Sequence, residues 1–239
     1  MALLEILAVV GAKGSPLTAA EIIEATGLPR STVFRKLREL CTASFLYEEQ
    51  TSKRYCLGPR VLELGETARE QLSSGTIVAG PLLGLVGDTG ETATFSILDA
   101  PWRICVRVIE APSDLRQVAH VGARYPLHLG AAGKVILAFL QPTMVLPILE
   151  SHGLVGDDAD SIVTELERIR SEGVAITTSE RVIGACTIAA PVLVRGRVFG
   201  SVAVVGPTDR MQPNLDRHLP RVLEVASALS LALPGSPPA

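Results

Sequence analysis

Residues 17–40, LTAAEIIEATGLPRSTVFRKLREL, contain the signals for a helix, a tight turn and a second helix. Thr18 is followed three residues later by Glu21, which is a capping-box pattern, so a helix is predicted to begin directly after Thr18. Gly27 can take the left-handed conformation that ends a helix, and Pro29 disfavours helical backbone at the residue before it. The chain is therefore predicted to turn there and to begin a second helix at Pro29.

The second helix is predicted to be amphipathic, with Val33, Leu37 and Leu40 on one stripe toward the core. Its other side is hydroxylic and basic. Guanidinium groups and hydroxyls bind phosphates and base edges, and a helix-turn-helix presents them at the start of its second helix. The residues predicted to contact DNA are Arg30, Ser31, Thr32, Arg35, Lys36 and Arg38. The competing interpretation is a solvated helix pair in an all-α domain, because arginine-rich helix faces are common.

Two short β-prone runs follow the second helix. Residues 45–47 (FLY) and 54–57 (RYCL) are separated by a polar segment, which is typical of a hairpin. A hairpin at this place makes the unit a winged helix-turn-helix. Lys53 and Arg54 are predicted to contact the DNA backbone from the wing, and residues 48–49, both glutamates, to point away from it. Apolar residues at helical spacing within 3–10 predict an additional first helix.

Charge is distributed unevenly along the 239 residues. The net charge of -3 argues against nucleic acid if it is taken globally. However, the chain up to Arg60 holds 8 of the 22 Lys and Arg against 6 of the 25 Asp and Glu, which leaves 14 against 19 for the remainder. The basic excess is small and confined to the predicted DNA reader, so groove contacts and dimerisation must supply much of the affinity.

Several other classes of protein are not favoured. The four cysteines are far apart and no basic secretory leader precedes them, which predicts reduced thiols. No segment is long and apolar enough to cross a membrane, so a cytoplasmic protein without a membrane partner is expected. The histidines lack metal-ligand spacing, and GAAGK at 130–134 lacks the glycine and the hydroxyl residue of a phosphate loop. We predict neither a cofactor nor a metal, and no enzymatic activity. Lys134 of that segment is expected at the surface or an interface.

The rest of the chain alternates strands with helices. A polar linker helix is predicted at 60–71, residues 73–75 are expected to mark a domain boundary, and residues 234–239 are expected to be disordered. An apolar helix is predicted from 76 to 86, broken near Gly84. Strands are predicted at 91–98 (half-buried), 102–110, 115–121, 174–178, 186–194 and 198–205, and helices at 131–140, near 145, at 161–171 and at 215–233. The pattern predicts an α+β domain with a mainly antiparallel sheet.

In the order and spacing of its motifs, the chain resembles the IclR family of bacterial transcription regulators. The segments that carry the resemblance are GLPRSTVFRKLREL (27–40), YCLGPRVLELG (55–65), TGET (89–92), RYPLHLGAAGKVILAFL (124–140), GACTIAAPV (184–192) and VVGP (204–207). It implies a winged helix-turn-helix DNA-binding domain (1–58), a linker helix (59–75) and a GAF-like effector-binding and oligomerisation domain (76–233). It also implies a homodimer or dimer of dimers, a double-stranded DNA operator, and a small-molecule effector, often an organic or aromatic acid. A contact with RNA polymerase is a further implication.

The resemblance also implies where the effector binds. The corresponding positions are Gln117, Tyr125, Ala131, Ala132, Thr177, Thr187, Ala203 and Val205. This chain departs from the family pattern, because Thr177 stands where some members have an acidic residue, and Ala203 and Val205 stand where serine can occur. A pocket without partners for a carboxylate would penalise a small dianion. The expected effector is therefore larger or more apolar than glyoxylate or pyruvate.

Two alternatives to a ligand-responsive DNA-binding regulator stay open on the sequence. In the first, the chain is a metabolite-binding or enzymatic module whose winged domain serves only assembly. In the second, the C-terminal domain only dimerises and binds no ligand. Operator binding that depends on the exposed basic face would separate the regulator from the first alternative.

Overall fold

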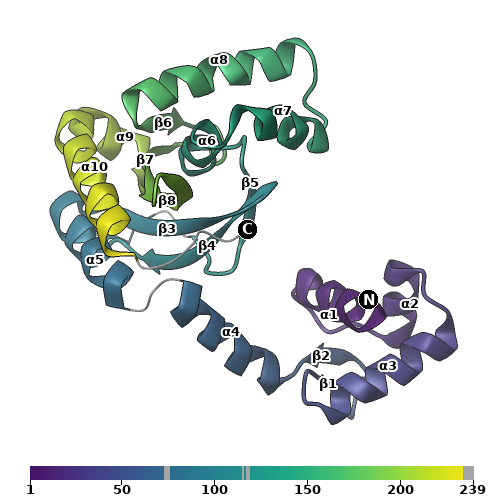
Figure 1. Cartoon of the computed structure of the whole chain (residues 1–239). Coiled ribbons are helices and arrows are strands. Elements are labelled where there is room, and N and C mark those ends of the chain that lie inside the picture. Colours follow the sequence, from purple (N-terminus) through teal and green to yellow (C-terminus); the bar gives the residue numbers. More distant parts are fainter. Residues whose placement is uncertain (73–75, 115, 117–118, 234–239) are drawn as a thin grey trace. The chain divides into compact units, whose positions relative to one another are not determined.

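The computed structural model describes residues 1–72, 76–114, 116 and 119–233 (Figure 1). The chain divides into two compact units, Met1–Ala68 and Arg69–Ala239. Helix α4 (Pro59–Leu72) contains the division and matches the predicted linker helix. The expected boundary at 73–75 and the expected tail at 234–239 lie outside the described residues, so the domain limits remain predictions.

The N-terminal unit is a three-helix domain with a hairpin. Its elements are α1 (Ala2–Lys13), α2 (Ala19–Thr26), α3 (Arg30–Thr42), β1 (Leu46–Glu48) and β2 (Tyr55–Leu57). The capping box forms as predicted, since the Thr18 backbone N–H donates to Glu21 Oε2 over 2.7 Å and the Glu21 N–H donates to Thr18 Oγ1. Gly27 ends α2 in the left-handed conformation, with φ 65°.

One hydrophobic core holds this unit together. Ile6 of α1, Ile22 of α2 and Leu37 of α3 are almost fully buried in it. The antiparallel pair β1 and β2 closes the core with Leu46 and Tyr55. Each helix therefore buries one stripe and leaves its other side to solvent, as the periodicity predicts.

The C-terminal unit is built on an antiparallel sheet. In the described part of the chain the sheet has the order β5-β4-β3-β8-β7-β6. Its strands are β3 (Thr92–Asp99), β4 (Trp102–Ile109), β5 (Arg124–Pro126), β6 (Ala175–Thr178), β7 (Ala185–Val194) and β8 (Arg197–Pro207). The predicted α+β class with an antiparallel sheet is therefore confirmed.

Helices cover both faces of this sheet (Figure 1). Helices α5 (Thr76–Thr89) and α10 (Leu215–Ala232) pack on one face, and α6 (Ala131–Ala138), α7 (Pro142–Ser151) and α8 (Asp157–Glu172) lie on the other. Helix α9 (Thr208–Met211) and a 3-10 turn (Gln212–Asn214) connect β8 to α10. None of the helices in the described ranges is long and apolar enough to cross a membrane.

Three predictions about these elements are wrong. Helix α5 continues through Pro81 and Gly84 to Thr89, because its buried side chains pack on the sheet and tertiary contacts outweigh local propensity. The third strand lies at 124–126, inside the expected loop, whereas the described residues among 115–121 form no strand. Strand β3 is not half-buried, since Thr92 and Ser96 on its polar side are 0% exposed. A sheet covered on both faces offers no solvent side to the polar half of the alternation.

Candidate functional site

Helix α3 presents an exposed basic face. Its buried stripe of Val33, Leu37 and Leu40 faces the core, and the residues predicted to contact DNA lie outside that stripe. Arg30, Ser31, Arg35 and Arg38 are exposed, and Thr32 and Lys36 are half-buried.

Two of these basic side chains already have partners on their own helix. The Arg30 guanidinium lies 5.5 Å from the centroid of the Phe34 ring, and Lys36 Nζ lies 2.7 Å from Glu39 Oε2. By contrast, within the described part of the chain no hydrogen bond or ion pair involves the side chains of Arg35 or Arg38. These two arginines are therefore the groups of the face that are most available to a phosphate or a base.

The wing places its two basic residues differently. The Lys53 side chain is 65% exposed and its Nζ is 3.9 Å from Glu48 Oε1. Arg54 Nη1 donates to the Pro16 carbonyl over 2.9 Å and to Glu21 Oε2 over 3.2 Å. Arg54 thus ties the wing to the capping box of α2, a role that the sequence did not indicate, and its contact with DNA stays a prediction.

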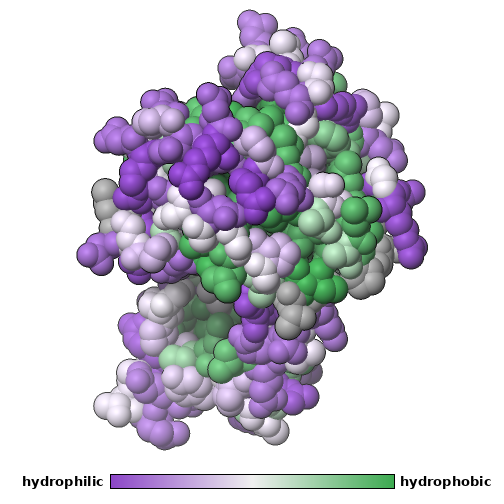
Figure 2. Space-filling view, turned by 90° about the vertical axis from the view of Figure 1, so that its left-hand side faces the viewer, coloured by the Kyte–Doolittle hydropathy of each residue, from purple (hydrophilic) through white to green (hydrophobic). Residues whose placement is uncertain are grey.

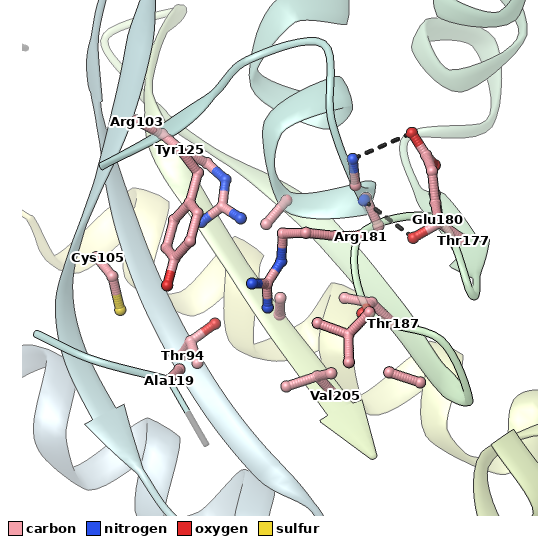
Figure 3. Close-up of a pocket in the computed structure, with 16 residues that line it drawn as sticks. Thr94, Arg103, Cys105, Ala119, Tyr125, Thr177, Glu180, Arg181, Thr187 and Val205 are labelled. Carbon is pink, nitrogen blue, oxygen red and sulfur yellow. Dashed lines mark hydrogen bonds between the residues drawn. The ribbon is translucent and has the colours of Figure 1, made fainter. Parts of the chain in front are cut away.

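A pocket lies in the C-terminal unit on the sheet face that α6 and α8 cover (Figure 3). Strands β3, β4, β7 and β8 form its floor, and β5, β6, the loop after β6 and the start of α6 form its walls. The cavity is about 40 Å³. The lining residues are Thr94, Arg103, Cys105, Ala119, Tyr125, Gly130, Ala131, Ala132, Thr177, Glu180, Arg181, Val182, Ala185, Thr187, Ala203 and Val205.

The structure brings most of the predicted effector residues together at this pocket. Those that line it are Tyr125, Ala131, Ala132, Thr177, Thr187, Ala203 and Val205. Gln117, the eighth, lies outside the described residues. Their contact with an effector stays a prediction. Because these residues come from five separate segments and line one pocket, the prediction refers to a single site.

Two arginines in the pocket correct the expectation of low polarity. Arg103 on β4 is 6% exposed, and its Nη1 donates to Ser96 Oγ over 3.0 Å, while its Nε has no partner among the described residues. Arg181 reaches the pocket from the loop after β6. Burial lowers the pKa of Arg103 to about 10, so its guanidinium remains charged at neutral pH. The pocket therefore does offer partners to a carboxylate.

The two guanidiniums are held against one aromatic ring. Arg103 Cζ and Arg181 Cζ each lie 4.7 Å from the centroid of the Tyr125 ring, within the range of a cation–π contact. Figure 3 shows both side chains extending into the space beside Tyr125. The cavity beside these three side chains, about 40 Å³, has room for only a few water molecules.

The start of α6 is tied to the opposite wall. The Gly130 N–H donates to Glu180 Oε1 over 3.2 Å, and the Ala131 N–H donates to Thr177 Oγ1 over 3.1 Å (Figure 3). Thr177 therefore serves the helix terminus in this structure, where two backbone N–H groups would otherwise be unpaired.

The structure also corrects the expected position of Lys134. It was expected at the surface or an interface, but it is 8% exposed, and its Nζ lies 2.8 Å from Glu165 Oε2 and 2.9 Å from Glu180 Oε1. Burial by itself would lower the pKa of Lys134, but its hydrogen bonds to the two carboxylates outweigh burial and raise it. The ammonium group thereby joins α6, α8 and the loop that carries Arg181.

The sequence contains a signal for some of the pocket residues that were not predicted and none for others. Arg103 and Cys105 alternate with apolar residues in β4, and this pattern would indicate a polar site if both faces of the sheet were known to be covered. Arg181 and Glu180 lie in a loop between two strands, where no periodicity applies. Only the fold brings them to the pocket, with Arg181 beside Tyr125 and Glu180 beside the start of α6.

The stability of the C-terminal unit should fall with acidification because of His128. Its Nδ1 is buried without a partner among the described residues, and its ring centroid lies 4.8 Å from that of His152. Burial, followed by the charge of His152, lowers the pKa of His128 below its ordinary value. The folded state thus resists protonation, and stability is expected to fall as the pH drops below about 6.5, by at most about 1.4 kcal/mol per pH unit for one group.

Urea unfolding between pH 7.5 and 5 tests this dependence. His128→Gln is expected to flatten the pH profile, whereas His120→Gln, at an exposed position, should leave it unchanged. Equal slopes for the wild type and His128→Gln would show that His128 does not contribute. His218, which is buried with its pKa lowered mainly by burial, should add a separate part of the slope.

Comparison with known proteins gives matches along nearly the whole chain. Residues 3–50 match the model of the IclR helix-turn-helix domain, and residues 76–231 match the model of the bacterial transcriptional regulator IclR C-terminal domain. The chain is 34% identical over 211 residues to the "Glycerol operon regulatory protein" of Streptomyces griseus. The aligned region covers 83% of this chain and 80% of that protein.

A second relative and a solved structure agree. The chain is 31% identical over 228 residues to the "DNA-binding transcriptional repressor YiaJ" of Escherichia coli K12, covering 91% of this chain and 80% of the relative. The crystal structure of an IclR homolog complexed with 4-hydroxybenzoate from Microbacterium hydrocarbonoxydans has a TM-score of 0.79 at 18% identity and covers 96% of each chain. At that identity the structure shows the shared fold.

Proposed function

Because the chain belongs to the IclR family of bacterial transcriptional regulators, we propose that its C-terminal domain binds a small organic acid and that this binding changes its affinity for an operator. The protein is a DNA-binding transcriptional regulator, and its relatives are regulators and not enzymes. The enzymatic alternative therefore loses its support. The observation that carries the proposal is the pair of guanidiniums beside Tyr125, which offers charge-assisted hydrogen bonds to an acid.

Two relatives support the same assignment. The Microbacterium protein is complexed with 4-hydroxybenzoate, an aromatic acid, and it shares the fold of this chain. The Escherichia coli relative is a DNA-binding repressor. By analogy, an acid bound in the pocket of this chain would change the affinity of the protein for DNA in the cytoplasm. A contact with RNA polymerase remains a separate prediction.

The effector proposal is tested by thermal unfolding of the full chain with a panel of organic acids. A ligand that binds only the folded state stabilises it by about 2.7 kcal/mol at a hundred times its Kd. The expected result is that at least one acid raises the unfolding temperature and that Arg103→Gln removes this rise. If no acid in the panel stabilises the protein at millimolar concentration, the alternative in which the C-terminal domain only dimerises gains the support.

For DNA, we propose that the exposed face of α3 reads the major groove. Arg35 and Arg38 are the two basic residues of that face that no intramolecular partner engages among the described residues. Ser31 at the start of the helix is exposed, as a phosphate or base contact requires. Arg30, Thr32 and Lys36 would complete the contact, with Lys53 on the backbone from the wing.

We propose that α4 pairs with the same helix of a second copy. Leu62 and Leu64 of α4 are 69% and 46% exposed, and Leu4 of α1 is 70% exposed. On the face of the molecule drawn in Figure 2, other hydrophobic side chains also reach the surface among hydrophilic ones. Association of two copies would remove such leucines from water.

This pairing implies that α4 transmits the effector signal. A ligand can act on DNA only through different affinities for two arrangements of the dimer. Cysteines introduced at exposed positions of α4 and crosslinked across the dimer are therefore expected to preserve dimerisation and to abolish the effect of ligand on DNA binding. An unchanged ligand response in the crosslinked dimer, measured by anisotropy, would exclude α4 as the transmitting element.

A further inference from the structure

We propose that the effector is a doubly charged anion, either a dicarboxylate or a phosphate monoester, held by Arg103 and Arg181 together. This inference rests on the proposed function of the pocket and adds the charge of the ligand. It reverses the expectation from the sequence, which disfavoured a dianion because the hydroxyls and the carboxylate of other family members are absent.

Arg103 supplies the first binding group. Its side chain is almost fully buried, and it enters the pocket from β4. Nη1 is engaged by Ser96, while the buried Nε finds no acceptor among the residues that the structure describes. A buried N–H of a charged group without an acceptor is costly, so an incoming oxyanion would satisfy it.

Arg181 supplies the second. No hydrogen bond or ion pair of its side chain occurs in the described part of the chain, and its guanidinium rests on the Tyr125 ring. Both guanidiniums lie 4.7 Å from the same centroid, so they can be no farther apart than twice that distance. Two like charges this close in a half-enclosed site repel each other, and a dianion placed between them would remove that repulsion.

The acidic side chain of the pocket walls and the N–H groups at the start of α6 are already engaged. Among the described lining residues the acidic one is Glu180, and its carboxylate accepts from the Gly130 N–H and pairs with Lys134. The Ala131 N–H at the start of α6 is taken by Thr177. The two arginines therefore remain as the cationic groups free to bind a ligand, and each can hold one acid group or two phosphate oxygens through parallel N–H bonds.

Binding must move the Arg181 side chain. The remaining cavity of about 40 Å³ is too small for any such anion while both guanidiniums rest on Tyr125. Arg181 lies on the loop 179–184, where Ile183 is 94% exposed and Ser179 and Gly184 have φ of 58° and 78°. No hydrogen bond or ion pair among the described residues holds the Arg181 side chain, so it can shift from the ring to the ligand while the loop backbone stays in place.

Calorimetry on the full chain at constant ionic strength tests the charge requirement with matched pairs. Succinate is compared with monomethyl succinate, and phenyl phosphate with methyl phenyl phosphate, so that each pair differs by one charge. At least one dianion is expected to bind at least about tenfold more tightly than its partner. Preference in the succinate pair alone would identify a dicarboxylate site, and in the phosphate pair alone a phosphomonoester site.

Arg181→Gln is the decisive variant, because Arg181 lies on a loop and is not part of either hydrophobic core cluster of the C-terminal unit. The substitution is expected to weaken the binding of the preferred dianion by about ten- to a hundredfold, so that the variant binds the dianion about as tightly as the matched monoanion. Arg197→Gln removes an exposed arginine of β8 that does not line the pocket and should leave the preference unchanged. Arg103→Lys keeps a charge without the planar fork and is expected to give an intermediate loss.

Three results would overturn the inference: monoanions that bind as tightly as their matched dianions, a preference for dianions that survives in Arg181→Gln, or no binding of either dianion at millimolar concentration. A monoanion such as 4-hydroxybenzoate that binds and alters operator affinity would overturn the dianion inference alone and leave the proposed function standing. If no acid of either charge bound or altered operator affinity, both would fail.

Discussion

Replacing Arg35 with alanine is expected to weaken operator binding by about thirtyfold to more than ten-thousandfold, without affecting folding or dimerisation. Loss of an arginine contact to a base costs about 1–3 kcal/mol, and a dimer loses it at both half-sites. Arg35 is exposed on α3, and no side chain in the described part of the chain engages its guanidinium. Its removal should therefore leave the protein's own contacts intact.

The matched control removes a positive charge from the same unit but from another helix. Lys13 is exposed at the end of α1, so Lys13→Ala should change operator affinity only slightly and through general electrostatics. Anisotropy titrations of both variants at two salt concentrations make the comparison, with circular dichroism and sedimentation to check fold and assembly. Equal losses for both variants, or an unchanged Arg35→Ala affinity, would mean that α3 does not read the operator.

Replacing Lys134 with methionine is expected to destabilise the C-terminal unit by about 3 kcal/mol. Removing one partner of a buried ion pair costs about 3–5 kcal/mol because an uncompensated charge stays behind. The lower end applies here, since the side chains of Glu165 and Glu180 are 30% and 27% exposed. For a domain of this size the loss corresponds to a decrease of about 6–12 °C in unfolding temperature.

Arg168→Met provides the comparison for this second substitution. Arg168 pairs with Glu172 across one turn of α8 at 2.6 Å, but both side chains are about half exposed. Such pairs contribute about 0.3–0.5 kcal/mol, so this variant should unfold almost like the wild type in urea. If both variants lost the same stability, the Lys134 cluster would be no more than a surface ion pair.

The winged unit was predictable because its signals are local. The capping box at Thr18, the left-handed Gly27 and the stripe of Val33, Leu37 and Leu40 each depend on residues within a few positions of one another. The structure contains all of them at the expected places. Arg54 is the exception, because its partners Pro16 and Glu21 are more than thirty residues away.

In the C-terminal unit, burial depended on contacts that no local pattern contains. The alternation in β3 gave the right strand but the wrong exposure, since Thr94 and Ser96 on its polar side are 7% and 0% exposed in a sheet that helices cover on both faces. Lys134 looked like a surface residue for the same reason: its two carboxylate partners come from α8 and from the loop after β6. A charged residue in an otherwise apolar helix was the available signal of a buried ion pair.

The pocket was located through the family resemblance, but its charge was not. Thr177 stands where some family members have an acidic residue, and Ala203 and Val205 stand where serine can occur, which indicated an apolar site. That inference considered only the positions of the family pattern. Arg103 and Arg181 are brought to Tyr125 by the pairing of β4 with β5 and by the course of the loop after β6. The electrostatics of the site therefore follow from the fold and not from the motif.

The most direct test of a ligand-responsive regulator is a fluorescence-anisotropy titration of the full chain on its own upstream intergenic DNA, with unrelated DNA as competitor and with the acids that stabilise the protein present or absent. We expect specific binding that weakens with salt, and a midpoint that at least one of these acids shifts several-fold in the wild type but not in Arg181→Gln. If the protein binds this DNA specifically but none of the acids shifts the midpoint, the result would contradict a ligand-responsive regulator.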